Sequence, residues 1–218
     1  MSSIFDKLRA WRLSSKEQGS TQSAPSLQLI VGLGNPGSNY SNTRHNAGER
    51  WVRALAAEHA ITLKRESRFQ GDIGRGPILD REIRLLIPAT FMNLSGHSVS
   101  TLLRYFKIAP EKILVVHDEV AFATGIAKLK VGGGLNGHRG LESIVQELGG
   151  NKDFVRLRIG VGHPGDPNSL SAYLTKREMP PKERELATES ARIENDAFEA
   201  LLDGDMQRAM GLFHSSNT

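Results

Sequence analysis

Short apolar runs alternate with amphipathic segments from Leu27 onward, and this alternation constrains the fold more than any other feature of the sequence. The runs are typical of buried strands and cover residues 27–33, 82–87, 112–119 and 154–162. Between and after them, apolar residues recur at helical spacing in 47–60, 95–107, 141–149 and a tail segment from Pro180 to about Gly204. Strands alternating with helices predict an α/β fold: a single domain with a mixed, mostly parallel central sheet and helices on both faces.

The composition excludes several classes of protein. The chain has no cysteine, which excludes disulfides, thiolate nucleophiles and cysteine-ligated zinc and fits a cytoplasmic location. None of the seven histidines has the helical spacing of a metal pair with a carboxylate in range, so no metal site is expected. No window approaches the roughly 18 to 20 apolar residues of a membrane span, so no membrane association is expected.

The first 26 residues differ from the rest. Ile4, Phe5, Leu8 and Trp11 recur at helical spacing among basic residues, and a stretch rich in Ser, Gln and Gly follows. We interpret residues 1–26 as a flexible polar and basic N-terminal extension and residues 27–214 as the catalytic domain. An organelle transit peptide is the alternative, although the segment contains acidic residues that such peptides avoid.

The sequence "GLGNPG" follows the first predicted strand and has the glycine spacing of a dinucleotide-binding loop. That motif works only when a helix begins at the third glycine, because the N-terminus of the helix binds the pyrophosphate. Here Pro36 and a polar, turn-forming stretch follow instead. The sequence therefore predicts no dinucleotide cofactor, and the loop instead displays Asn35, Tyr40 and His45.

Three polar clusters follow predicted strands and should converge at the carboxyl edge of the sheet, where α/β proteins bind their ligands. They are the loop of Asn35 to His45, the stretch "PATFMN" that ends at Asn93, and Asp118 with its neighbours. A histidine paired with a carboxylate acts as a general base, so His45 and Asp118 are candidates for activating water. Asn35 and Asn93 offer amides that can hold a substrate or an oxyanion. A purely structural role for each of these residues alone stays open.

A glycine-rich loop and two basic pairs are candidates for binding an anion. The loop "VGGGLNGHRG" carries Asn136, His138 and Arg139, and it lacks the Lys-Ser/Thr of a P-loop. The basic pairs alternate along two strands, so each pair projects from one face of its strand. They are Lys128 with Lys130, and Arg156 with Arg158. Because arginine matches phosphate geometry, we predict a phosphate-binding patch and a nucleic-acid partner, although edge-strand lysines can also serve only to prevent aggregation.

Five motifs, in order and spacing, resemble those of the bacterial-type peptidyl-tRNA hydrolases. They are "VGLGNPGSNYSNTRHNAG", "PATFMNLSG", "LVVHDE", "GGGLNGHRGLESI" and "RLRIGVGHPG". The resemblance implies a monomeric α/β enzyme without a cofactor that hydrolyses the ester between a peptide and the 3′ ribose of tRNA, and so recycles tRNA in translation. By this resemblance His45 is the general base, Asp118 supports it, Asn35 discriminates N-blocked substrates and Asn93 positions the substrate.

The resemblance also assigns residues that bind the tRNA. It implies that Tyr40, Phe91 and Met92 line the channel for the terminal adenosine and the first peptide unit, and that Lys130 and Arg158 clamp the tRNA 5′ phosphate. One position departs from the pattern: the family's Gly-His-Asn-Gly reads Gly137-His138-Arg139-Gly140 here. Arginine cannot accept a hydrogen bond from water, although Asn136 can supply the missing amide. The alternative function is therefore a catalytically weak RNA-binding or splicing-partner protein on the same fold.

Overall fold

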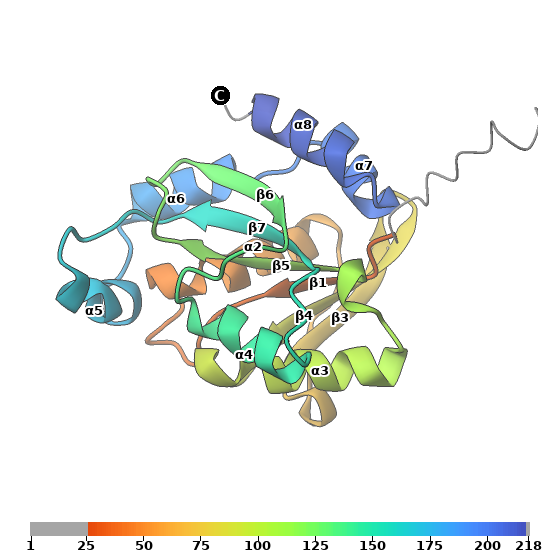
Figure 1. The fold of residues 1–218 in the computed structure, drawn as a ribbon, viewed down its shortest axis with the longest axis horizontal. Coiled ribbons are helices and arrows are strands. Elements are labelled where there is room, and N and C mark those ends of the chain that lie inside the picture. Colours follow the sequence, from red (N-terminus) through yellow and green to blue (C-terminus); the bar gives the residue numbers. More distant parts are fainter. Residues whose placement is uncertain (1–25, 217–218) are drawn as a thin grey trace, which may run out of the picture.

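The structure is a computed structural model that describes residues 26–216, so the predicted N-terminal extension lies, apart from Ser26, outside the described residues (Figure 1). The strands are β1 (Leu29–Gly32), β2 (Lys64–Glu66), β3 (Gly71–Ile78), β4 (Arg81–Pro88), β5 (Ile113–Glu119), β6 (Ala127–Val131) and β7 (Val155–Gly160). The helices are α2 (Ala47–Glu58), α3 (Ser95–Phe106), α4 (Arg139–Glu147), α5 (Leu170–Thr175), α6 (Pro181–Ser190), α7 (Asn195–Asp203) and α8 (Met206–Ser216).

The strands form one mixed sheet in the order β2-β3-β4-β1-β5-β7-β6. The four central strands, β4, β1, β5 and β7, run parallel to one another, whereas β2, β3 and β6 pair antiparallel at the two edges. The predicted α/β class and mostly parallel sheet are therefore confirmed. The carboxyl ends of β4, β1 and β5 lie side by side, which brings together the three polar segments that follow them.

Helices cover both faces of the sheet (Figure 1). In β1, Leu29 and Val31 face one apolar cluster, which contains residues of α3 and α4, and Ile30 faces the other, which contains residues of α2, α6, α7 and α8. Both clusters are closed to solvent, as the alternation of side chains along a buried strand requires. None of the helices in residues 26–216 is both long and apolar enough to cross a membrane.

A close approach between α2 and β5 positions the site. A Cβ atom at Gly48 would lie 2.1 Å from the carbonyl oxygen of Val116, so only glycine lets the first turn of α2 lie against β5. The short 3-10 turn η1 (Arg44–Asn46) directly precedes α2. The same contact therefore holds His45 beside the end of β5.

One expectation about the helices was wrong. The tail helix is interrupted, because α6 ends at Ser190 and α7 begins at Asn195. At the break, the carbonyl of Ala191 accepts a hydrogen bond from the Trp51 indole at 2.9 Å, and Ile193 turns into the core. These tertiary contacts outweigh the local helical pattern.

Candidate active site

A cavity of about 440 Å³ opens at the carboxyl ends of β1, β4 and β5. The segment after β1 contributes Asn35 and His45, and the segment after β4 contributes Met92 and Asn93. Asp118 comes from the end of β5 itself. The predicted convergence of these three segments is confirmed.

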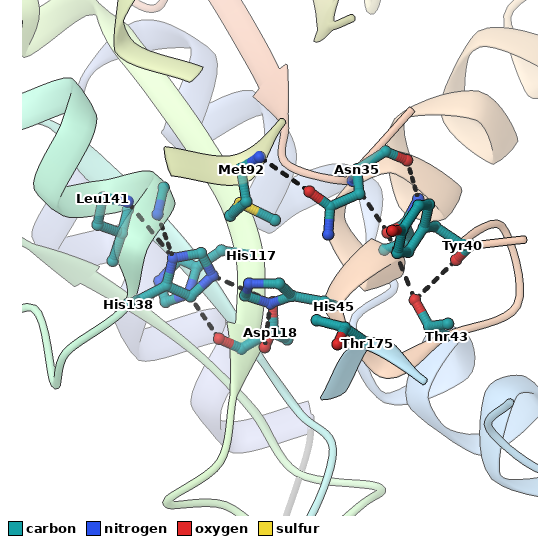
Figure 2. Close-up of polar contacts among 12 residues, drawn as sticks. Asn35, Tyr40, Thr43, His45, Met92, His117, Asp118, His138, Leu141 and Thr175 are labelled. Carbon is teal, nitrogen blue, oxygen red and sulfur yellow. Dashed lines mark hydrogen bonds and ion pairs between the residues drawn. The ribbon is translucent and has the colours of Figure 1, made fainter. Parts of the chain in front are cut away.

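His45 and Asp118 both line the cavity and form a buried, hydrogen-bonded pair (Figure 2). The Nδ1 atom of His45 lies 2.9 Å from one carboxylate oxygen of Asp118 and 3.1 Å from the other. Because an ionised carboxylate only accepts hydrogen bonds, this contact places the ring proton on Nδ1. It leaves the Nε2 lone pair of His45 free to take a proton from another molecule.

The pKa of His45 reflects opposing influences. Burial lowers this pKa, but the charge and hydrogen bond of Asp118 more than offset burial and raise it above the ordinary value of 6.5, while the Arg139 charge lowers it again. Burial alone would raise the pKa of Asp118, yet the two imidazoles that face it hold that pKa well below its usual range. Asp118 therefore stays ionised, and its charge holds the pKa of His45 above the ordinary value.

His138 is the second imidazole on Asp118. Its Nε2 atom lies 3.1 Å from the same Asp118 oxygen, and its Nδ1 atom accepts the backbone N–H groups of Gly140 and Leu141 (Figure 2). His138 thus caps the N-terminus of α4 and carries its proton on Nε2. From the sequence we expected His138 to contact a substrate; in the structure it connects the glycine loop to the carboxylate of Asp118.

The ligand atoms of His45, Asp118 and His138 all lie within 4.8 Å of one another, which is close enough for a metal ion. Sequence spacing gave no sign of this cluster, because its members come from three distant segments. A metal on Nε2 of His138 would require the proton to move to Nδ1, where two backbone N–H groups already point. The hydrogen-bond pattern therefore favours a proton-bearing His138 over a metal ligand.

His117 and Glu119, the buried neighbours of Asp118 in the third polar cluster, were given no role of their own from the sequence. The buried ring of His117 packs edge-on against His138 at 4.9 Å, and burial, followed by the charge of His138, lowers its pKa well below 6.5. His117 is therefore neutral and supports the His138 ring. Glu119 accepts hydrogen bonds from Asn136 and Arg158. Sequence spacing does not indicate these contacts, because the partners of Glu119 are 17 and 39 positions away.

Asn35 is held in one orientation by its neighbours. Its side-chain oxygen accepts the backbone N–H of Met92 at 2.8 Å, while Asn46 bonds to both the backbone N–H and the carbonyl of Asn35 (Figure 2). Because the oxygen is engaged, the amide nitrogen is the group left for a ligand. Asn93 lines the same cavity and is exposed.

The residues expected to line the adenosine channel lie at the rim and wall of the cavity. Phe91 and Met92 line the cavity, and Phe91 is 54% exposed. Tyr40 contacts Phe91 edge-on, with ring centroids 6.4 Å apart. The exposed ring of Phe91, with the half-buried ring of Tyr40 beside it, offers a surface on which a base can stack.

The four basic residues do share one region, since β6 pairs with β7 so that Lys128 lies opposite Arg158 and Lys130 opposite Arg156. Their environments differ. Arg156 is buried and donates hydrogen bonds to the carbonyls of Gly132 and Gly134, so it supports the glycine loop. Arg158 pairs with Glu119 at 2.9 Å, whereas both lysines are exposed.

Asn136 lines the cavity from the glycine loop, and Arg139 lines it from the start of α4. The amide nitrogen of Asn136 lies 3.2 Å from a Glu119 oxygen, so it is already engaged. The Arg139 side chain is exposed and makes no hydrogen bond or ion pair with any residue in 26–216. The cavity thus contains one cation that the described part of the chain does not neutralise.

The comparisons with known proteins agree on one family. A family model described as peptidyl-tRNA hydrolase matches residues 29–218. The peptidyl-tRNA hydrolase of Histophilus somni is 48% identical over 183 residues, 84% of this chain and 94% of that protein. That of Shewanella denitrificans is 48% identical over 189 residues, 87% and 96% of the two chains. The solved peptidyl-tRNA hydrolase of Acinetobacter baumannii is 42% identical, with a TM-score of 0.81, and covers 89% of this chain and 97% of that one.

Proposed function

Because this chain belongs to the peptidyl-tRNA hydrolase family and hydrolyses the ester bond of peptidyl-tRNA, we propose that His45 activates the attacking water. The buried contact of 2.9 Å between His45 and Asp118 is the observation that supports this role most directly. It fixes the ring proton on Nδ1 and leaves Nε2 of this cavity-lining histidine free to accept a proton. The curated relatives and the intact pair favour the enzyme, and no observation favours the alternative of a binding or splicing-partner protein.

The reaction follows from this geometry. Nε2 of His45 takes a proton from water while the water oxygen bonds to the ester carbonyl carbon, and the carbonyl electrons move onto oxygen. Asp118 stabilises the imidazolium that forms. The tetrahedral intermediate then expels the 3′ oxygen of the tRNA, which takes the proton back from His45. The products are a peptide with a free carboxyl group and a tRNA with a free 3′ hydroxyl.

The two asparagines contribute amide groups without carrying protons. Asn93 is exposed in the cavity wall, where its amide can position the substrate or donate to the oxyanion. The amide nitrogen of Asn35 is available to a peptide carbonyl, a group that an N-blocked substrate has and a free amino-acid ester lacks. Asn35 is therefore the residue that selects for blocked substrates, and Tyr40 with Phe91 and Met92 lines the channel for the terminal adenosine.

The basic residues of β6 and β7 bind the tRNA outside the cavity. Lys128 and Lys130 are exposed, and Lys130 with Arg158 holds the 5′ phosphate. Arg156 acts indirectly by holding the glycine loop. For the enzyme we propose a monomeric state and a cytoplasmic location, which the bacterial-type peptidyl-tRNA hydrolase family implies. Light scattering that gave the mass of a dimer would contradict the monomer.

The experiment that tests the base is release of free tRNA from N-acetyl-aminoacyl-tRNA by the wild type and by His45→Ala. We expect the variant to lose about 10²- to 10⁴-fold in kcat, the usual contribution of a general base. His59→Ala is the matched control, because His59 follows the far end of α2 and does not line the cavity. A wild-type protein that binds this tRNA yet releases none above the uncatalysed rate would refute the catalytic role.

A further inference from the structure

The charged side chains at the cavity differ in how they are paired. Asp118 accepts hydrogen bonds from the imidazoles of His45 and His138. Glu119, the other acid of the wall, forms an ion pair with Arg158 at 2.9 Å. Arg139 has no ion-pair or hydrogen-bond partner in residues 26–216. The wall therefore presents one guanidinium whose hydrogen-bond donors are available to an incoming anion.

Arg139 lies near the reacting atoms but on the solvent side of them. It is the first residue of α4 and directly follows His138, whose ring is 5.0 Å from that of His45. Its charge reaches His45, since it lowers the pKa of that imidazole. Its side chain is nevertheless exposed, so a substrate can reach the guanidinium without entering the base of the cavity.

Basic residues flank both ends of the glycine loop that ends at His138. Lys130 lies at the β6 end, where a Cβ atom at Gly133 would come within 2.8 Å of the lysine Cε, so the side chain runs along the loop. Arg139 lies at the α4 end. Two cations along one loop match a strand that carries a phosphate at every nucleotide better than they match a single carboxylate.

We propose that Arg139 is a specificity-determining residue that binds the phosphate joining the last two nucleotides of the tRNA. The inference rests on the proposed function, because that phosphate is the permanent anion nearest to the 3′ ester that the enzyme cleaves. A guanidinium can hold it through two parallel hydrogen bonds. The asparagine of the family pattern has no charge to offer at this position, so the contact distinguishes this chain.

Binding of two small ligands tests the contact without relying on turnover. The dinucleotide cytidylyl-adenosine contains the phosphate, and adenosine lacks it. We expect Arg139→Gln to weaken dinucleotide binding about tenfold to a hundredfold, the usual effect of losing a charged hydrogen bond, and to leave adenosine binding unchanged. Arg139→Lys should restore part of the loss, because it keeps the charge but not the fork. Arg104→Gln, an exposed arginine on α3 that does not line the cavity, is the matched control.

Hydrolysis assays separate this role from its competitors. With N-acetyl-aminoacyl-tRNA, Arg139→Gln should raise KM, and the slope of log KM against log salt should fall by about 0.7, the change expected for one phosphate on a single strand. With N-acetyl-aminoacyl-adenosine, which has no phosphate, KM should not change. Three results would overturn the proposal. The first is that Arg139→Gln weakens binding of the dinucleotide and of adenosine equally, and the second is that it lowers kcat equally on both esters. The third is a defect confined to substrates with an acidic side chain. Absence of hydrolysis by the wild type would instead refute the proposed function, and dinucleotide binding would still decide the role of Arg139.

Discussion

Replacing Asp118 with asparagine removes the charge of the catalytic carboxylate and keeps its shape. In the wild type, two imidazole N–H groups point at the same Asp118 oxygen, from His45 at 2.9 Å and from His138 at 3.1 Å. An asparagine has one acceptor oxygen, and its amide group donates. Because both Asp118 oxygens lie within 3.1 Å of Nδ1 of His45, the amide nitrogen of the variant faces His45 in either orientation, and a ring that accepts from it must change its tautomer. If His45 changes, its free lone pair no longer faces the water.

The size of the effect follows from the distance and the burial. At 2.9 Å and an effective dielectric constant of about 20, a carboxylate and an imidazolium attract each other by about 6 kcal/mol. Water screens the pair little, since the side chains are only 9% and 2% exposed. This attraction develops fully only when His45 is protonated, that is, during the reaction. Each 1.36 kcal/mol in the activation barrier changes the rate tenfold, so losing about 6 kcal/mol would slow the reaction by about 10⁴-fold at most. We therefore expect kcat to fall about 10²- to 10⁴-fold.

The pH dependence has a definite sign. His45 must be unprotonated to act, so activity in the wild type falls as the pH drops through the raised pKa of His45. In Asp118→Asn, burial and Arg139 still lower that pKa, and the carboxylate that raised it is gone. The acid limb of kcat/KM should therefore move to lower pH, and NMR titration of the His45 ring should show the same shift.

The assay is release of tRNA from N-acetyl-aminoacyl-tRNA between about pH 5 and 8, the range in which histidines titrate. Asp203→Asn is the matched control, because Asp203 is exposed, pairs only with Arg81 among the described residues and lies outside the cavity. Turnover within threefold of the wild type, or an acid limb that stays in place or moves to higher pH, would show that Asp118 does not support the base.

Two further substitutions test substrate selection and packing. Asn35→Asp keeps the acceptor for Met92 but replaces the amide donor with a charge, so the ratio of kcat/KM for blocked over unblocked aminoacyl-tRNA should fall, and an unchanged ratio would count against the selective role. Gly96→Ala would place a Cβ atom 2.1 Å from the carbonyl oxygen of Ser143, so urea denaturation should show a loss of about 1–3 kcal/mol in unfolding free energy. The control is Gly211→Ala, whose Cβ atom meets nothing within 4 Å and should cost no stability. Equal stability of both variants would contradict this packing.

The sequence predicted the site well where the physics is local or follows from sheet topology. Short apolar runs identified β1, β4 and β5, and parallel strands end at one edge, which was enough to bring His45, Asp118 and Asn35 together. The alternation along β7 likewise placed its two arginines on one face of the strand. These inferences needed only the spacing of apolar residues within each helix or strand and the direction in which each strand runs.

Contacts that depend on exact strand order could not be read in the same way. Arg156 resembled a surface cation, yet β7 lies between β5 and β6, so its side chain is buried and donates hydrogen bonds to the loop carbonyls. The break after α6 depends on the Trp51 indole, which is 140 positions from its acceptor, Ala191. In both cases a long-range hydrogen bond determines the local structure, and local propensity carries no information about it.

The opposite influences of Asp118 and Arg139 on the pKa of His45 predict that phosphate binding at Arg139 changes the strength of the base. Asp118 raises the pKa of this base and Arg139 lowers it, so a phosphate bound to Arg139 would neutralise the lowering influence. His45 would then be a stronger base in the complex than in the free enzyme. Since kcat reports the complex and kcat/KM the free enzyme, the acid limb of kcat should lie at higher pH than that of kcat/KM. The gap should close in Arg139→Gln, where no charge is left to neutralise; a gap of the same size in that variant would show that Arg139 does not transmit phosphate binding to the base.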